Sequence, residues 1–494
     1  MRSRLRRRIT LGLVIGCSTL GAGAACNDTL QGSLSLVTGP DNALTQSPQP
    51  NLLSVQLIAQ NNAITTVANV PLPATAGFAI PSQTGSNTDI IRITGFDDAG
   101  DAVASGQTLP VELDELSGIT LNLFIQRRGQ FSRLPEAGIT ASDAAAPLLT
   151  TLFSRYIMIT DSTGTDAARQ TQLYDTLTWQ TMAAPPALPF APESLVYVNA
   201  WTGSDASVEA GVTGIAALLD INAKTAQWLD LTDTTADAAV YIDASAPQGG
   251  TFAEVAGGAT VYNTTTGDTY VVGPTRPKGA TNAILRISAT GVMSILNLSA
   301  PRAGAAATYL PGEGLMVFGG SPETGDASTA PGGEYVKDDG TVVPLACAPT
   351  DTTTGAGAVP LAATHAKDNP TQVLLAGGVT ASGKSAGVRV YDYTQCTSGD
   401  AGAAWTAWSA PGTDPDGGGS AVTFLRAQVF DLDSANAVVV GVDKTGNTSA
   451  YALTQTEASP LPLRQTHPHA SAIVLPNGSL AVVGGGNTPE SFIR

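Results

Sequence analysis

The sequence predicts an all-β protein in two parts: a small β-sandwich, then a longer region of repeated units of short strands. Three observations predict this class. The 494 residues include 53 glycines and 31 prolines, only 13% of them are charged, and lysine occurs six times. This composition suits short strands joined by turns and disfavours long amphipathic helices. Apolar segments alternate with turns early in the chain, and later apolar runs repeatedly end at Gly-Gly.

The charge balance narrows the possible partners. The formal net charge is −17 and the isoelectric point is near 4.5. Nucleic-acid binding requires a basic surface, so nucleic acid is excluded as a ligand. Hydrophobic residues make up 43% of the chain, enough to build a core and to exclude intrinsic disorder.

Residues 1–25 have the layout of a lipoprotein-type signal peptide. Met1–Arg8 holds five arginines and no acid, Ile9–Leu20 is apolar or small, and a run of small residues ends at Cys26. The apolar run is shorter than the ~20 residues that span a bilayer. We predict export and acylation at Cys26, with Cys17 as the alternative acceptor. The protein would be an outer-membrane or cell-surface lipoprotein, held at the membrane by its lipid only. Plain cleavage, which gives a periplasmic or secreted protein, remains open.

Residues 26–50 read as a polar tether with room for one strand, and residues 51–118 as the sandwich. The clearest strand is Asp89–Phe96, followed by a turn at Asp98–Asp101 and a partner strand from Val103 to Val111. Strands at this spacing are typical of a small sandwich, immunoglobulin-like in architecture.

Repeats begin after residue 118. Three segments share a strand, a turn and an apolar strand that stops at a glycine pair: Gly319-Gly320, Gly377-Gly378 and Gly484-Gly485. These segments resemble the kelch repeat, in which the pair ends the second strand of a propeller blade. Four degenerate copies are expected around Tyr156–Ile159, Leu195–Val198, Thr269–Gly273 and Ala437–Gly441.

The resemblance implies a kelch-like β-propeller over residues 119–494, with seven blades and six as the alternative. Trp179 and Trp228 would mark the fourth strands of their blades. The last repeat provides only two apparent strands. We therefore expect 119–125 and 130–135 to supply its third and fourth, so that both ends of the repeat region share one composite blade.

Few residues suggest chemistry. His467 and His469 could face one side of an extended segment, but a metal site needs further ligands and His365 is the only other histidine. Neither cofactor nor metal is therefore expected. Galactose-oxidase-type copper enzymes share a kelch-like propeller, yet no cysteine here has the matching context. The acidic clusters Asp97–Asp101 and Asp414–Asp416 read as solvated turns.

Two further patterns concern structure. Cys347 and Cys396 are the only cysteines of the repeat region, and export favours a disulfide between them, although they follow strands that end on opposite faces of the ring. Ser398, Asp400, Gly402 and Trp405 resemble the Asp-box of sialidase propellers, which is a structural turn remote from the active site. No residue is assigned a catalytic role.

These observations favour a noncatalytic binding protein of the cell envelope, which uses propeller loops to recognise a carbohydrate or another protein. The alternative is a propeller enzyme, a glycan-active hydrolase or lyase or, with weaker support, an oxidase, whose active-site residues are dispersed over several blades.

Overall fold

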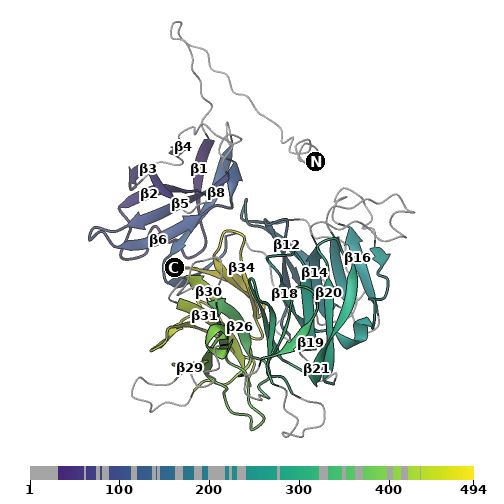
Figure 1. Cartoon of the computed structure of the whole chain (residues 1–494). Coiled ribbons are helices and arrows are strands. Elements are labelled where there is room, and N and C mark those ends of the chain that lie inside the picture. The colour runs from purple at the N-terminus through teal and green to yellow at the C-terminus, as the bar shows by residue number, and fades with distance from the viewer. Residues whose placement is uncertain are drawn as a thin grey trace, which may run out of the picture.

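The structure is a computed structural model of the whole chain (Figure 1). It describes residues 32–494 except for the following segments: 60–62, 74–77, 81–87, 113–118, 136–140, 142–144, 162–170, 183–191, 199–216, 222–224, 231–240, 275–278, 322–331, 346, 348–351, 362–370, 398–403, 413–420 and 434–435. Within this part, strands build one eight-stranded sheet and seven four-stranded sheets, so the fold is almost entirely β.

The eight-stranded sheet forms the N-terminal part of the molecule. Its order is β3-β2-β5-β6-β8-β1-β4, with β7 pairing β5. The strands are β1 (Gly32–Thr38), β2 (Leu52–Ile58), β3 (Ile64–Pro71), β4 (Phe78–Ile80), β5 (Thr88–Phe96), β6 (Ala102–Gln107), β7 (Val111–Glu112) and β8 (Thr120–Arg127).

One hydrophobic core joins the two halves of this sheet. Leu34 from β1, Val55 from β2, Ile93 from β5 and Leu123 from β8 belong to a single buried cluster. Because residues from both ends of the strand order meet there, the sheet curls around the cluster.

Seven four-stranded antiparallel sheets follow. Those of the first half contain β10 (Leu148–Leu152), β11 (Tyr156–Thr160), β12 (Thr171–Asp175) and β13 (Gln180–Met182); β14 (Ser194–Val198), β15 (Ala217–Ile221), β16 (Ala226–Asp230) and β17 (Tyr241–Asp243); and β18 (Gly258–Tyr262), β19 (Thr269–Pro274), β20 (Thr281–Ile287) and β21 (Met293–Arg302), the last sheet being preceded by the 3-10 helix η4 (Phe252–Glu254).

The next three sheets and the last one follow in the same order. The first two contain β22 (Ala306–Leu310), β23 (Gly314–Phe318), β24 (Glu334–Val336) and β25 (Val342–Pro344), and then β26 (Gly357–Leu361), β27 (Gln372–Ala376), β28 (Val388–Asp392) and β29 (Trp405–Trp408), with helix α2 (Tyr393–Thr397) between β28 and β29. The third contains β30 (Phe424–Asp433), β31 (Asn436–Asp443), β32 (Thr448–Leu453) and β33 (Ala458–Leu461). The last contains β34 (Ser471–Val474), β35 (Leu480–Gly484), β36 (Asn487–Ile493) and β9 (Gln130–Arg133).

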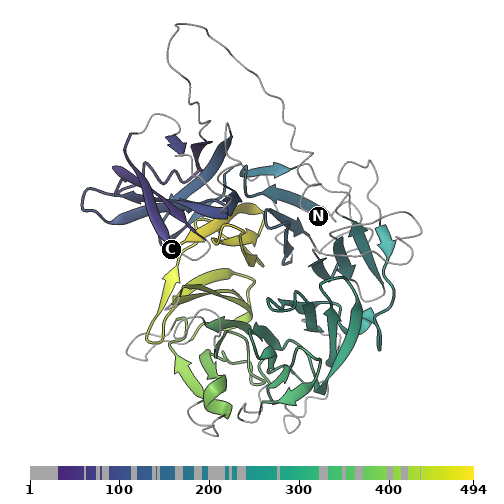
Figure 2. The ribbon, with the colours of Figure 1, turned by 45° about the horizontal axis from the view of Figure 1, so that its top comes forward.

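The first strands of these sheets contact one another in a closed cycle, from β10 through β14, β18, β22, β26 and β30 to β34 and back to β10. They therefore line the inside of a ring, and Figure 2 shows the sheets arranged around its axis. This is a propeller-like fold. The second strands β23 and β35 are buried along their whole length, as strands covered by neighbours on both faces must be.

Three expectations need correction. Thr120–Arg127 was expected in the last blade but pairs with β1 and β6 of the eight-stranded sheet. The last sheet needs no such strand, because Asn487–Ile493 supplies its third strand itself. Gly32–Thr38, within the expected tether of residues 26–50, is a strand of the same sheet, which thus extends beyond 51–118 on both sides.

The third correction concerns one repeat. Leu195–Val198 was expected as a second strand, but β14 is the first strand of its sheet and β15 is the second. Trp228 consequently lies in the third strand, β16, rather than in the fourth. Its side chain is buried in a core with Val196 and Val198.

Candidate functional site

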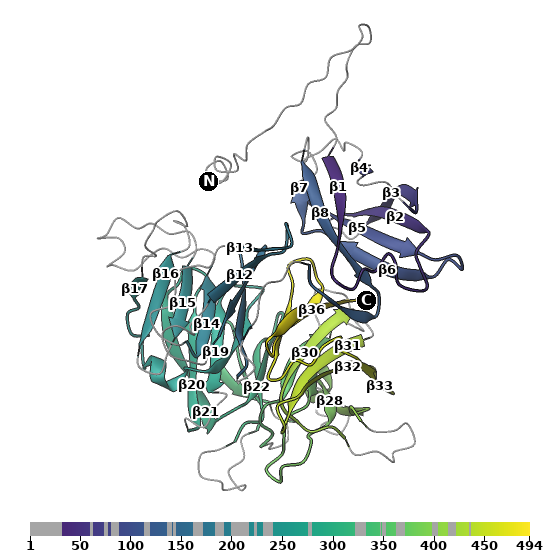
Figure 3. The same ribbon diagram turned by 180° about the vertical axis from the view of Figure 1, so that it is seen from behind.

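The sheet that closes the ring joins the two ends of the repeat region. β9 pairs antiparallel with β36, and Phe131 lies opposite Phe492 with their ring centroids 5.4 Å apart. The expected fourth strand near 130–135 therefore occurs, and its partner is the strand at the end of the chain. Arg464 reinforces the pairing, since its Nε donates to the carbonyl oxygen of Phe131 at 2.8 Å. Figure 3 shows β36 beside the N-terminal sheet.

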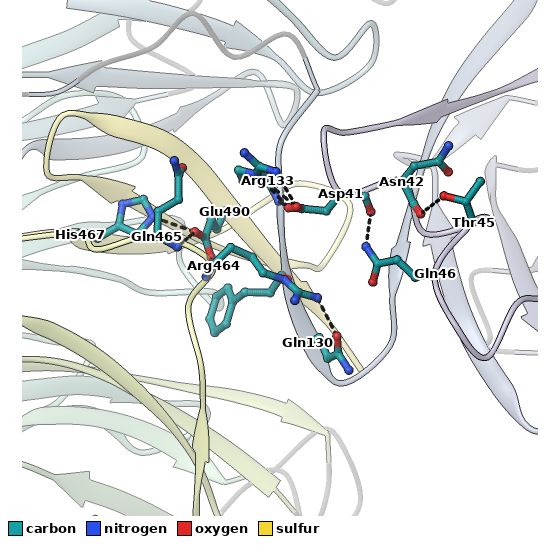
Figure 4. A network of polar contacts seen from close by, with 11 residues as sticks. Asp41, Asn42, Thr45, Gln46, Gln130, Arg133, Arg464, Gln465, His467 and Glu490 are labelled. Atoms are coloured by element: carbon teal, nitrogen blue, oxygen red, sulfur yellow. Dashed lines mark hydrogen bonds and ion pairs between the residues drawn. The ribbon is translucent and has the colours of Figure 1, made fainter.

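A buried polar network surrounds Glu490 of β36, the strand that pairs with β9 (Figure 4). Glu490 of β36 is fully buried, and its carboxylate accepts hydrogen bonds from the backbone N–H groups of Arg464 and Gln465, each at 2.7 Å. His467 Nε2 lies 3.2 Å from the same carboxylate, and His467 Nδ1 lies 2.8 Å from the carbonyl oxygen of Gly484. The network thus links the entry to β34, the end of β35 and the middle of β36.

The sheet β22–β25 contains the same network with an arginine in place of the histidine. Arg302, fully buried, donates to the carbonyl oxygen of Gly319 at 3.0 Å and to Glu334 Oε1 at 2.5 Å. Glu334 Oε2 accepts the N–H of Ser299 at 2.8 Å, as Glu490 accepts that of Arg464. Burial lowers the pKa of Arg302 below its ordinary value, and the Glu334 carboxylate opposes this effect.

Sequence reasoning missed Glu334 and Glu490. Each is an isolated acid in a short third strand, and each follows a glycine pair after a connection of different length. The signal that could have found them is a basic side chain four residues before a first strand together with an acid in the third strand.

The glycine pairs at the ends of the second strands have positive φ angles. Gly319, Gly377 and Gly485 have φ of 63°, 71° and 71°, a left-handed conformation that favours glycine. A Cβ on Gly485 would lie 2.4 Å from Pro468 Cδ, and one on Gly319 would lie 2.6 Å from the carbonyl oxygen of Thr353. Both the turn and the neighbouring segment therefore exclude a side chain here. Gly320, Gly378 and Gly484 also have positive φ.

The eight-stranded sheet contacts the ring on the side opposite to the glycine pairs. Asn477, in the turn between β34 and β35, exchanges hydrogen bonds with Gln107 at the end of β6. Phe124 of β8 packs on Trp179, with ring centroids 5.1 Å apart, and Trp179 Nε1 donates to the carbonyl oxygen of Asn122 at 3.3 Å. Trp179, expected as a propeller motif residue, lies in the turn before β13 and joins the sheet to the ring.

An ion pair fixes the same junction. Arg133 at the end of β9 pairs with Asp41, with its NH2 nitrogen 2.7 Å from Asp41 Oδ1, and the backbone N–H of Arg133 donates to Asp41 Oδ2 at 2.8 Å. Burial alone would raise the pKa of Asp41, but the hydrogen bonds from Arg133 outweigh it and the net shift is downward. Asp41 therefore stays ionised and ties the sheet to the closing strand.

The two histidines that the structure describes, His467 and His469, have different surroundings. His467 is committed to Gly484 and Glu490, while the ring of His469 packs against Gly446, and His365 lies outside the described residues. In the part of the chain that the structure describes, no group of three or more His, Cys, Asp or Glu side chains could hold a metal ion. Asp97 accepts hydrogen bonds from the N–H groups of Ala99 and Asp101, as a turn residue does.

Cys347 lies in an aromatic cluster and is disulfide-bonded. Its carbonyl oxygen accepts a hydrogen bond from Trp405 Nε1 at 3.2 Å, and Trp405 packs on Tyr391 with centroids 5.1 Å apart. Burial raises the pKa of Tyr391 well above its ordinary value, so that its phenol is neutral. Cys396 is in α2, but its side chain lies outside the described residues, so the pairing with Cys396 stays a prediction.

Other sequence predictions also fall outside the description. Of the residues that resemble an Asp-box, Ser398, Asp400 and Gly402 are not described, whereas Trp405 begins β29. Cys17 and Cys26 precede the described part of the chain. No described helix is long and apolar enough to cross a membrane.

No protein-family model matches the chain. No curated protein sequence matches it either. Among solved structures, BBS1N in complex with ARL6DN is 11% identical, covers 74% of this chain and 98% of its own, and has a TM-score of 0.43. A DUF4784 family protein from Bacteroides caccae is 10% identical, covers 77% and 94%, and has a TM-score of 0.30. NanB sialidase from Streptococcus pneumoniae is 11% identical, covers 88% and 80%, and has a TM-score of 0.19.

Proposed function

We propose that the protein is an exported scaffold of the cell envelope, which binds a protein or a glycan through the face of the ring that carries the glycine pairs. The ring would be a seven-bladed kelch-like propeller. The N-terminal sheet would be an immunoglobulin-like domain that connects the ring to a lipid at Cys26. The binding would be noncatalytic.

The observation that carries this proposal is the side on which the N-terminal sheet docks. It contacts the turns at Trp179 and Asn477, which lie at the opposite ends of the strands from Gly484-Gly485. A tether that precedes the sheet would therefore hold the glycine-pair face away from the membrane, where loops are accessible to a partner.

The connections on the glycine-pair face suit adaptable recognition. After Gly319 and Gly377 the chain takes long connections, 319–333 and 377–387, before the third strand begins. They are rich in glycine, serine, threonine and alanine. Side chains of this kind provide hydrogen bonding at little steric cost, which proteins use in binding loops.

Site-specific photo-crosslinking in cells tests the proposal. A photoreactive residue at Ser382, exposed in the 377–387 connection, should give a defined adduct with one envelope component. The matched control is Asp339, exposed in the turn between β24 and β25 on the docking side, which should give none. Equal labelling from both positions, or no adduct from Ser382, contradicts the choice of face.

The location is tested separately. The Cys26→Ala variant should leave the membrane fraction, and mass spectrometry of the wild-type N-terminal peptide should detect an acylated cysteine. Unchanged fractionation with no lipid on that peptide would show that export as a lipoprotein is wrong.

A further inference from the structure

The outermost strand of the N-terminal sheet is open on one side. β3 ends the strand order and pairs with β2, and no described strand lies on its other side. Ile64, Thr65 and Thr66 are all exposed, and the Ile64 side chain is 56% exposed. Such an edge presents backbone donors and acceptors to any further strand.

The register shows which backbone groups point outward. The N–H of Ala59 donates to the carbonyl oxygen of Ala63 at 3.0 Å, just beyond the pair Ile58 and Ile64. Hydrogen-bonded and non-hydrogen-bonded pairs alternate along an antiparallel ladder, so Thr65 bonds to Leu57 while Ile64 and Thr66 direct their N–H and C=O groups away from β2. The two outward residues Ile64 and Thr66, on either side of Thr65, are thus available for pairing.

This edge lacks the usual protection against pairing. Proteins place charges, above all lysine, on edge strands, together with bulges and prolines. No charged residue occurs from Asn42 to Thr88, in a chain whose net charge is −17. The bulge opposite Val55 and Gln56 and the proline at Pro71 both lie beyond Thr65, and they leave the first part of β3 flat.

An apolar row on the outer surface of the sheet ends at the same edge. Ile64 lies opposite Ile58, which in turn lies opposite Ile90 of β5. Ile58 is only 8% exposed, whereas Ile64 at the open end of the row is 56% exposed. A strand added beyond β3 would bury Ile64 and complete the row.

We propose that the occupant of this edge is β3 of a second copy of the chain, paired antiparallel about a two-fold axis. Elsewhere two copies with the same large negative charge repel each other, whereas the neutral β3 allows approach without a charged contact. A two-fold axis requires reciprocal pairs. Outward residues must face outward residues, so Ile64 pairs with Thr66 of the other copy, Thr66 pairs with its Ile64, and the two Thr65 residues meet on the axis.

Proline substitutions on the edge test the pairing. Thr66→Pro removes an outward N–H that β2 does not use, so the fold is retained, as proline is tolerated on edge strands. Asn69→Pro is the matched control, because Asn69 also lies opposite a β2 residue but falls outside the proposed pairs. Sedimentation equilibrium of the full chain, in a non-ionic detergent that prevents association through an N-terminal lipid, should show a reversible dimer for wild type and Asn69→Pro. Thr66→Pro should weaken the dimer at least about tenfold. A monomer at every wild-type concentration, or an unaffected Thr66→Pro dimer, overturns the proposal.

A cysteine on the axis provides an independent readout. In Thr65→Cys the two introduced thiols would face each other at a non-hydrogen-bonded position, where Cα atoms lie ~4.5 Å apart, within the range of a disulfide. Mild oxidation should give a covalent dimer, which Asn69→Cys and the wild-type chain do not form. Equal crosslinking of Asn69→Cys and Thr65→Cys, or none from Thr65→Cys, contradicts the register.

Discussion

The sheet β22–β25 and the closing sheet contain the same polar network, but they differ in where their strands come from. In β22–β25 a continuous stretch of chain supplies all four strands, and an almost fully buried ion pair joins Glu334 of β24 to Arg302 at the end of β21. In the closing sheet β9 comes from the start of the repeat region, and a histidine replaces the arginine. The locally built sheet thus contains a buried arginine–glutamate pair, whereas the closing sheet has a histidine at the corresponding position.

The largest effect should follow removal of the strand that joins the ends. A chain that stops after Gly486 lacks β36, so β9 loses its partner and the network loses Glu490. Because the ring would open at one sheet, we expect the whole ring to be destabilised, with the melting temperature lowered by roughly 10 °C or more. Differential scanning calorimetry measures this. A chain that lacks only Arg494 is the control, and an unchanged transition after the longer truncation would show that closure contributes little.

Glutamate substitutions compare the two networks directly. Glu334→Gln leaves the buried guanidinium of Arg302 without its counter-charge, which costs about 3–5 kcal/mol. Glu490→Gln faces a histidine and two backbone N–H groups, and it should cost about 1–3 kcal/mol. Urea denaturation followed by circular dichroism gives both values. If Glu490→Gln cost more stability than Glu334→Gln, the carboxylate would contribute more to the network that contains the histidine.

Two adjacent glycines of the closing sheet allow the cost of a left-handed backbone to be measured separately from the cost of steric crowding. Gly485 and Gly486 have φ of 71° and 69°, but a Cβ would meet Pro468 at 2.4 Å only at Gly485, whereas nothing lies within 4 Å at Gly486. Gly486→Ala should therefore cost ~1 kcal/mol from the left-handed backbone alone. Gly485→Ala should cost ~3 kcal/mol, because Pro468 must also move. Equal losses in the same urea assay would show that the neighbouring segment yields without cost.

The smallest effect concerns the tie between the N-terminal sheet and the closing strand. Since the pKa of Asp41 is lowered from its ordinary 3.8, its contribution is complete above that pH and is lost as the pH falls through the lower, folded value. Asp41 and Arg133 are partly exposed, so Asp41→Asn should cost only about 1 kcal/mol at neutral pH. Comparing the melting of Asp41→Asn and wild type from pH 7 downward should show a constant difference above pH 3.8 that shrinks as the pH falls below it. A difference that already shrinks well above pH 3.8 would mean that the ionised Asp41 carboxylate is not its source.

The sequence predicted the repeats well and their junction less well. Apolar strands that end at glycine pairs are a local signal, and Gly314–Phe318, Gln372–Ala376 and Leu480–Gly484 are the second strands expected. β8 was misplaced because the apolar residues of Thr120–Arg127 suit either partner, and only tertiary pairing with β1 decides between them.

The polar network could not be predicted by the same signal. Glu334 and Glu490 stand at unequal distances from their glycine pairs, and a single acid in a short strand has no pattern of its own. Their role depends on residues brought near in space, such as Arg302 and His467. Lipidation, the disulfide partner of Cys347 and the ligand stay predictions.

The pairing of β9 with β36 also determines when the ring can form. The ribosome makes β9 long before β36, so the two are separated by nearly the whole repeat region during synthesis. Until β36 is available, Phe131 has no Phe492 to cover it, and the unfinished ring exposes a strand edge. Contacts so distant in sequence form slowly. The ring therefore cannot close until β36 has been made and can pair with β9.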